Sequence, residues 1–376
     1  MRGSDALVVG AGCVGANVAY RLAERGARVI VLDAGAPGAG TSGASFAWTN
    51  SFHKTPRDYH DLNVASMAEH ALLAKELGGG WLHQDGALAW ETSATALARL
   101  AGAVERLAAW GYAIERISPR QARDLEPDLA IEPGVDEVVW TPEEGYVEAV
   151  PFIGALLAEA ARRGARVRSG KRVTGVMRAG ARVHGVSTER GDRVEADWVV
   201  DCAGVATDEI ARLAGVPLSI GRVPGRLIYT RPVATTLRRP VHAPGCHFRP
   251  DGGGRVVLAE GAHDQVWAEA GAPWPPERSL AAVASYLPPL TGARVEATRV
   301  GIRPMPRDER PMVGTVPGLD GFYVVASHSG VTLGPLLGRI AAAELLDRAV
   351  DPRLAPYRPA RFLQDPVASP GPPPAT

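Results

Sequence analysis

The chain of 376 residues has few cysteines, and their spacing restricts the class of protein it can be. The three cysteines, Cys13, Cys202 and Cys246, lie far apart and form no Cys-x-x-Cys pair. Disulfide frameworks and structural zinc sites use cysteines at close or regular spacings. We therefore expect no disulfide framework and no metal, and the composition suits a reducing compartment.

The sequence also lacks an excess of charge and a long apolar run. Its 41 basic and 41 acidic residues cancel, so nothing indicates a nucleic-acid partner or an anionic membrane surface. No apolar stretch approaches the roughly 18 residues that cross a bilayer, and the first apolar strand starts too close to Met1 for a signal peptide. We expect a cytoplasmic protein with no transmembrane segment. Residues 364–376 hold five prolines and are predicted to be a disordered tail.

The beginning of the chain carries a glycine-rich turn between an apolar strand and a helix. An apolar run over 6–9 leads into Gly-Ala-Gly-Cys-Val-Gly at 10–15, and a second apolar run ends at Asp33. In dinucleotide-binding units the glycines permit the tight turn, the approach of a pyrophosphate and the packing of helix on strand, and the acid binds a ribose. We predict such a site, with the pyrophosphate at the helix N-terminus. The candidate residues are Gly10, Gly12, Cys13, Val14, Gly15, Asp33 and Ala34. We interpret the Cys13 thiol as a packing group, not a reactive one.

Four later segments also contribute candidate cofactor contacts. Residues 35–45 are rich in glycine and small hydroxyl side chains, and we expect a loop beside a ligand, with a flexible surface loop as the alternative. Further candidate contacts lie at three expected strands, over 172–177, 193–200 and 322–326. The last two strands run into turns of small residues that precede helices. The candidates are Thr41, Ser42, Val173, Ala203, Gly204, Gly330, Val331 and Thr332.

The apolar periodicity predicts an α/β fold with two structural domains. Helices are expected over 58–77, 94–110, 119–125 and 151–163, and strands over 87–90, 137–141, 165–168, 182–188, 226–230 and 255–258. We assign 1–45, 146–215 and 300–363 to a discontinuous Rossmann-like nucleotide-binding domain. The segments 46–145 and 216–299 are assigned to a second, sheet-rich α+β domain that faces the substrate.

In their order along nearly the whole chain, six segments resemble the FAD-dependent D-amino-acid oxidase superfamily, which includes D-amino-acid dehydrogenases, glycine oxidase and sarcosine oxidases. The segments are 10–15 with Asp33, 40–42, 144–147, 200–204, 301–304 with 311–314, and 327–335. The resemblance implies FAD as cofactor. It also implies an amine or amino-acid substrate, whose C–N bond is oxidised to an imine by hydride transfer to flavin N5 and then hydrolysed.

The same resemblance assigns two electrostatic roles. The helix that opens at Gly330 would direct its N-terminal dipole at flavin N1 and O2, where the reduced flavin gathers negative charge. Arg303 occupies the arginine position of a Gly-x-Arg-Pro motif, where the family often binds the substrate carboxylate. The alternative for Arg303 is a structural ion pair with Asp308 or Glu309.

The sequence departs from the family's pattern in ways that leave the electron acceptor open. The sarcosine-oxidase branch carries a lysine for the reaction with oxygen in a Leu-Lys-x-Gly-x-His run, but 258–263 is Leu-Ala-Glu-Gly-Ala-His. The lysine is missing, and His263 remains as a candidate catalytic residue. No cysteine follows Arg303, so we expect FAD to be bound non-covalently. The expected electron acceptor is oxygen or another oxidant. The alternatives to an amine or amino-acid oxidising enzyme are an FAD-binding subunit of a dehydrogenase complex and an NAD-linked dehydrogenase.

Two histidines near the predicted substrate pocket remain ambiguous. His53 and His60 lie in a segment that could line this pocket, but a solvated or core-paired role is favoured for each. The substrate's identity and stereochemistry and the oligomeric state are not indicated by the sequence.

Overall fold

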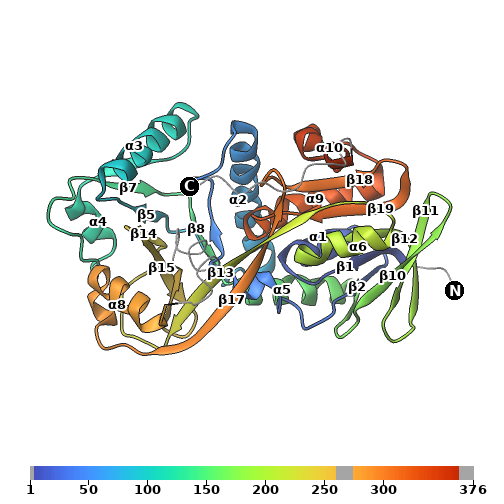
Figure 1. The fold of residues 1–376 in the computed structure, drawn as a ribbon, viewed down its shortest axis with the longest axis horizontal. Coiled ribbons are helices and arrows are strands. Elements are labelled where there is room, and N and C mark those ends of the chain that lie inside the picture. The colour runs from blue at the N-terminus through green and yellow to red at the C-terminus, as the bar shows by residue number, and fades with distance from the viewer. Residues whose placement is uncertain (1–3, 260–273, 364–376) are drawn as a thin grey trace.

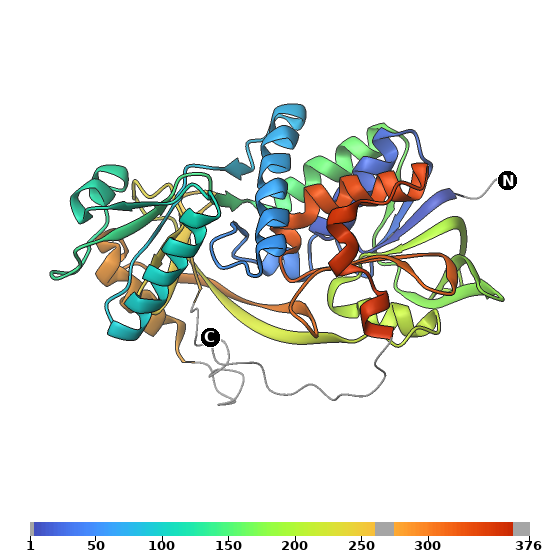
Figure 2. The ribbon, with the colours of Figure 1, turned by 90° about the horizontal axis from the view of Figure 1, so that it is seen from above.

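The structure is a computed structural model, and it describes residues 4–259 and 274–363. The molecule is elongated, with an eight-stranded sheet at each end and helix α2 (Arg57–Leu77) between them (Figure 1). Seen from above, α2 again separates the two parts (Figure 2). None of the helices in the described ranges combines the length and the apolar character needed to span a bilayer.

The first sheet is the expected parallel nucleotide-binding sheet, with antiparallel strands at one side. Its central strands pair in parallel: β1 with β2 and β12, and β12 with β19. In sheet order the strands are β10 (Val173–Ala179), β11 (Arg182–Thr188), β19 (Leu319–Ala326), β12 (Arg193–Asp201), β1 (Ser4–Val9), β2 (Val29–Leu32) and β9 (Arg166–Arg168), with β18 (Met312–Val316) beside β19.

Both faces of this sheet are buried, which explains why its strands are almost continuously apolar. Val8 packs into a cluster with helices α1 (Cys13–Glu24), α5 (Ala149–Arg162) and α9 (Gly330–Asp347), whereas Leu7 and Val9 face the opposite cluster, toward α6 (Thr207–Leu213). Successive side chains of a strand point to opposite faces, so each face gains its own apolar layer. The glycine turn is thereby held between β1 and α1.

The second sheet is mainly antiparallel. In sheet order its strands are β17 (Val295–Pro306), β13 (Ile220–Thr230), β16 (Arg255–Ala259), β15 (Cys246–Asp251), β14 (Val241–Ala243), β5 (Ala87–Ala89), β7 (Val138–Thr141) and β6 (Glu115–Ile117). The helices of this part are α3 (Ala94–Ala109), α4 (Pro119–Leu125) and α8 (Pro276–Tyr286). The expected α/β fold with a second sheet-rich region is thus confirmed.

Short elements complete the chain. A small sheet is formed by β3 (Trp48–Thr49), β8 (Gly145–Val147) and β4 (Leu82–His83). The remaining short helices are η1 (Thr41–Ala44), η2 (Gly204–Ala206), η3 (Pro288–Leu290), η4 (Pro352–Tyr357) and α10 (Ala360–Leu363).

Two features differ from the sequence expectation. The segment 35–45 is not entirely irregular, because η1 forms inside it with a turn bond from Gly43 N–H to the Gly40 carbonyl (3.2 Å). Strand β13 is much longer than the strand expected over 226–230, and β17 was not predicted; the two pair from Ile220 opposite Pro306 to Thr230 opposite Val295. Glycine and proline in 220–225 and 301–306 disguised these strands, since both residues weaken strand signals.

The two long strands connect the two parts of the molecule, which bears on the proposed domain boundaries. In Figure 1, β13 and β17 run from the second sheet toward the first. Helix α2 belongs to the segment 46–145, yet it packs against α9, where the Leu336 N–H donates to Ser66 Oγ (3.3 Å). The division into a nucleotide-binding and a substrate domain stays a prediction, and the predicted disordered tail, 364–376, lies outside the described residues.

Candidate active site

Two adjoining hollows lie between the two parts of the molecule. One is a groove of about 210 Å³ along the glycine turn, and the other is a cavity of about 340 Å³ between β13, β17 and the start of α9. Both are lined by Thr41, Ser45, His328 and Val331. A long ligand could therefore lie in the groove and reach into the cavity.

The glycine turn is shaped by backbone contacts that leave no room for side chains. Gly10 has a φ of +104°, and a Cβ there would lie 2.4 Å from the Cys202 carbonyl oxygen. A Cβ on Gly15 would lie 1.9 Å from the Gly10 carbonyl oxygen. The turn thus brings β1, α1 and the end of β12 into close contact, as the dinucleotide interpretation requires.

The N-terminus of α1 is suited to an anion. Its first turn carries no acidic residue, and Gly12 at the N-cap offers no side-chain cap. The Cys13 N–H donates to Ser42 Oγ (3.0 Å), which brings the loop of 35–45 onto the helix end. Exposed N–H groups and the helix dipole favour a phosphate at such a position. The groove therefore has the donors and the space that the diphosphate of FAD needs.

Asp33 lies beside this turn at the end of β2. Its carboxylate accepts hydrogen bonds from the Ala11 N–H and the Gly35 N–H, each at 2.7 Å, and it lines the groove. On the cavity side, the Thr41 hydroxyl donates to the Ile302 carbonyl (2.5 Å) and ties η1 to β17. These bonds fix both ends of the loop along the groove.

Most of the predicted cofactor residues come together, although they are far apart in sequence. Thr332 lines the cavity. Three predicted residues, Gly15, Ala34 and Val173, line neither hollow. Of these, Gly15 packs behind Gly10, and Val173 is buried in the sheet. The predicted residues that line the groove are Gly10, Gly12, Cys13, Val14, Asp33, Thr41, Ser42, Ala203, Gly204, Gly330 and Val331. His263, the second candidate catalytic residue, lies outside the described residues.

All three cysteines are buried, and none has the character of a reactive thiol. Burial raises the pKa of Cys13 and of Cys246 to about 12 each, and that of Cys202 well above its ordinary value. A thiol reacts as the thiolate, which burial disfavours. The packing role expected for Cys13 agrees with this environment.

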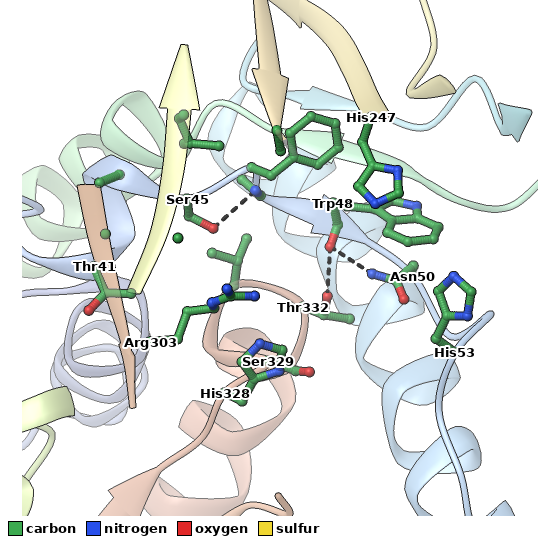
Figure 3. A pocket seen from close by; sticks show the side chains of 18 of the residues that line it. Thr41, Ser45, Trp48, Asn50, His53, His247, Arg303, His328, Ser329 and Thr332 are labelled. Atoms are coloured by element: carbon green, nitrogen blue, oxygen red, sulfur yellow. Dashed lines mark hydrogen bonds between the residues drawn. The ribbon is translucent and has the colours of Figure 1, made fainter. Parts of the chain in front are cut away.

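Arg303 extends from β17 into the cavity (Figure 3). Its Nη2 donates to the Pro224 carbonyl on the neighbouring strand β13 (2.9 Å). Asp308, one of the two acids considered as its structural partner, instead forms an ion pair with Arg361 (2.8 Å). The Arg303 side chain lines the cavity wall.

The start of α9 forms the wall opposite β13 and β17. Ser329 is its N-cap residue, and the Ser329 hydroxyl is hydrogen-bonded to the Tyr59 hydroxyl (2.8 Å). The Thr332 hydroxyl donates to the Trp48 carbonyl (3.1 Å), and the first turn of the helix contains no acidic residue. The positive end of the helix dipole thus faces the cavity.

Four of the histidines that the structure describes line the cavity, and the protein around them keeps them neutral. Burial is the main cause in every case: it lowers the pKa of His53 and His328 to about 3, that of His247 to about 4 and that of His242 well below its ordinary value. His242 and His247 are hydrogen-bonded through their Nδ1 atoms (2.8 Å). At neutral pH these residues supply hydrogen bonds and aromatic surface, not charge.

The two ambiguous histidines of the sequence separate in the structure. His60 is in the core, where its Nδ1 is hydrogen-bonded to Ser51 Oγ (2.8 Å) and its ring packs on Trp110 and Tyr112. His53 is not core-paired: it is exposed and lines the cavity (Figure 3). No local pattern in the sequence distinguishes the two: His60 lies on α2, whereas His53 lies in the loop before it.

Sequence reasoning missed Lys54, which also lines the cavity. Burial lowers the pKa of its amine to about 8, partly offset by the negative charge of Glu144. The chain has only three lysines, Lys54, Lys75 and Lys171, and this scarcity is the one signal that could have drawn attention to it. His242 and His247 were also missed, since β14 and β15, which carry them, were not predicted.

Glu144 supports the loop that carries His53 and Lys54. It is fully buried, and its Oε1 accepts hydrogen bonds from the Ser51 N–H (2.9 Å), the Phe52 N–H (2.9 Å) and the Tyr112 hydroxyl (2.6 Å). Burial nevertheless raises the pKa of Glu144 to about 7, because these bonds only partly offset the desolvation.

Comparison with known proteins assigns the chain to a family. Over residues 5–344 its sequence matches the FAD dependent oxidoreductase family DAO, and the chain belongs to this family. It is 29% identical to the uncharacterized oxidoreductase YurR of Bacillus subtilis (strain 168), over 95% of this chain and 99% of that protein. It is 27% identical to a glycine oxidase of Geobacillus kaustophilus (strain HTA426), over 96% of this chain and 97% of that protein.

Solved structures agree with this assignment. The crystal structure of glycine oxidase from Geobacillus kaustophilus matches with a TM-score of 0.82 and 25% identity, over 94% of this chain and 98% of that chain. L-proline dehydrogenase from P. horikoshii matches with a TM-score of 0.84 and 20% identity, over 96% and 98%, which shows a shared fold. The protein is thus an FAD-dependent oxidoreductase, and the NAD-linked alternative is not supported.

Proposed function

We propose that this enzyme oxidises the C–N bond of an amine or amino acid to an imine, which water then hydrolyses. The observation that carries the proposal is the position of Arg303 in a cavity that adjoins the FAD groove at the start of α9. A planar guanidinium binds a carboxylate through two parallel hydrogen bonds, so it can fix an amino acid in one orientation. The relatives named glycine oxidase act on such a substrate.

The residues that would hold FAD follow from the groove. The turn at 10–14 and the N-terminus of α1 would bind the diphosphate, and Asp33 would bind a ribose hydroxyl. The start of α9 would stabilise negative charge at the flavin end. The burial of the three described thiols favours non-covalent binding. When bound, FAD supplies the acceptor for the hydride that leaves the substrate carbon.

The cavity also favours the neutral amine that this reaction needs. A lone pair on nitrogen is required to form the C=N bond as hydride departs from carbon. Positive charges at Lys54 and Arg303 disfavour an additional cation beside them, so they lower the pKa of a bound substrate ammonium. The four neutral histidines add no charge of their own. Orientation by Arg303 and this electrostatic bias are what the chain contributes to the chemical step.

The test is Arg303→Leu, with Arg307→Leu as the matched control. Arg307 directly follows β17 and is exposed. We expect Arg303→Leu to lose at least about 100-fold in kcat/KM for amino acids, the weight of a bidentate charged contact, while the purified protein stays yellow. Flavin bleaching is followed anaerobically with D-amino acids, glycine, sarcosine, proline derivatives and simple amines. Unchanged kinetics in Arg303→Leu would refute the assignment.

The electron acceptor needs a separate measurement. The position of the sarcosine-oxidase lysine is Ala259 here, and Ala259 lines the cavity. We propose that the reduced enzyme reacts faster with an artificial acceptor than with oxygen, as a dehydrogenase or a subunit of a larger complex would. Rapid reoxidation by air-saturated buffer alone would show an oxidase instead.

A further inference from the structure

Lys54 is held in place by the structure around it. Its backbone N–H donates to the Ser51 carbonyl (3.1 Å), and the Glu144 carboxylate fixes the Ser51 and Phe52 N–H groups just before it. Its Nζ lies 5.8 Å from the centre of the Tyr59 ring, whose hydroxyl is bonded to Ser329 at the start of α9. These contacts direct the amine to the cavity, which it lines.

Within residues 4–259 and 274–363, the cavity lining gives this amine no anionic partner. Among the described residues that line it there is no aspartate or glutamate, although arginine and lysine are both represented. The one described anion that acts on the amine is Glu144, whose Oε1 is already taken by Tyr112 and two backbone N–H groups. Lys54 is half-buried, and a partly buried cation without a close anion is incompletely compensated, so a ligand that brings an anion would gain binding energy here.

Lys54 and Arg303 approach the cavity from different elements. Arg303 comes from β17, whereas Lys54 comes from the loop between β3 and α2. His328 lies within reach of both positive charges, and each adds to the effect of burial in keeping this histidine neutral. Figure 3 shows Arg303 and His53 on opposite sides of the cavity. Lys54 and Arg303 thus bring positive charge to the cavity from two different elements, and Arg226 of β13 also lines it.

We propose, on the basis of the proposed function, that the substrate is an amino acid with a second anionic group. Arg303 binds the first carboxylate, and Lys54 binds the second anionic group. The second group is carried either by the side chain, as in aspartate and glutamate, or by a substituent on nitrogen, as in iminodiacetate. In both cases the shared chemistry is a dicarboxylate with an oxidisable C–N bond.

The experiment compares acids with their neutral amides, which have nearly the same shape. FAD-loaded enzyme is assayed anaerobically with both enantiomers of aspartate, glutamate, asparagine and glutamine, and with iminodiacetate and its monoamide. The variants are Lys54→Met, Lys54→Arg and the control Lys75→Met, which removes an exposed lysine at the far end of α2.

We expect the wild type to prefer one acid over its amide. Lys54→Met should lose about 10- to 100-fold in kcat/KM for the acid alone, which is the contribution of one charge-assisted hydrogen bond. Lys54→Arg should keep part of the preference, and Lys75→Met all of it. Equal losses for acid and amide in Lys54→Met would overturn the proposal, because Lys54 would then serve every substrate. A wild type without preference for acids would overturn it as well.

A binding measurement separates this inference from the proposed function. Glutarate and its monoamide cannot be oxidised at a C–N bond alpha to a carboxylate, so calorimetric titration of the FAD-loaded protein reports binding alone. We expect glutarate to bind more tightly than the monoamide in the wild type and equally in Lys54→Met. If no amino compound is turned over, the proposed function fails, and this titration still decides whether Lys54 binds a second anion.

Discussion

Replacing Glu144 with glutamine should stabilise the protein above pH 7 and have little effect near pH 4.5. Burial raises the pKa of Glu144 in the folded protein from 4.5 to about 7. Between these values the folded state binds more protons at this site than the unfolded state, so stability falls as the pH rises. Below pH 4.5 the carboxyl is protonated in both states, and above about pH 7 the full loss is present. At 1.36 kcal/mol per pKa unit the loss is about 3 kcal/mol.

Glutamine is the appropriate replacement because it keeps the geometry of the site. The amide oxygen can still accept from the Ser51 and Phe52 N–H groups and from the Tyr112 hydroxyl, all of which contact Oε1. The amide NH₂ takes the place of Oε2, where the Thr141 hydroxyl at 3.3 Å can turn to accept. The variant therefore removes the buried charge and keeps the hydrogen bonds of the loop.

The assay is thermal unfolding of the FAD-loaded proteins at pH 5 and pH 8.5. For 376 residues the unfolding entropy is about 0.8 kcal/mol/K, so about 3 kcal/mol corresponds to a rise in Tm of roughly 4 °C at pH 8.5. The difference between Glu144→Gln and wild type should become small at pH 5. Glu144→Ala is the control: it leaves three buried donors unsatisfied and should lower Tm at both pH values. If Glu144→Gln and wild type differ by the same amount at both pH values, the buried carboxyl does not titrate as reasoned.

Two further predictions concern the FAD groove. Gly15→Ala would place a Cβ 1.9 Å from the Gly10 carbonyl oxygen, so the purified variant should lose most of its flavin absorbance, whereas Gly154→Ala, with open space around its Cβ on α5, should keep it. Ser42→Ala removes the acceptor of the Cys13 N–H and should weaken FAD binding about 10-fold, the weight of one hydrogen bond, in a fluorescence titration of the apoprotein. A flavin content in Gly15→Ala equal to that of Gly154→Ala, or an unchanged dissociation constant in Ser42→Ala, would contradict the assignment of the groove.

The groove could be predicted from sequence because each of its segments carries a strong local pattern, although the segments lie far apart in the chain. The turn at 10–15 is enclosed by its own strand and helix, and the apolar runs that form β1, β2, β12 and β19 are buried on both faces, which leaves a strong pattern. The cavity could not be predicted in the same way. It depends on β3 pairing with β8 and on β14 pairing with β5, across about 100 and about 150 residues of chain.

The charge of the cavity likewise emerges only on folding. The sequence is neutral overall, with equal numbers of basic and acidic residues, and this balance gives no hint of a one-signed cavity. In the structure the nearby acids are used elsewhere: Asp308 pairs with Arg361, and Glu144 holds a loop from behind. Since the four histidines are held neutral, the positive character of the lining comes from Lys54 and the arginines. The proposed role of Lys54 thus gives the choice of substrate to a residue without any motif, while the glycine-rich motif concerns only the cofactor.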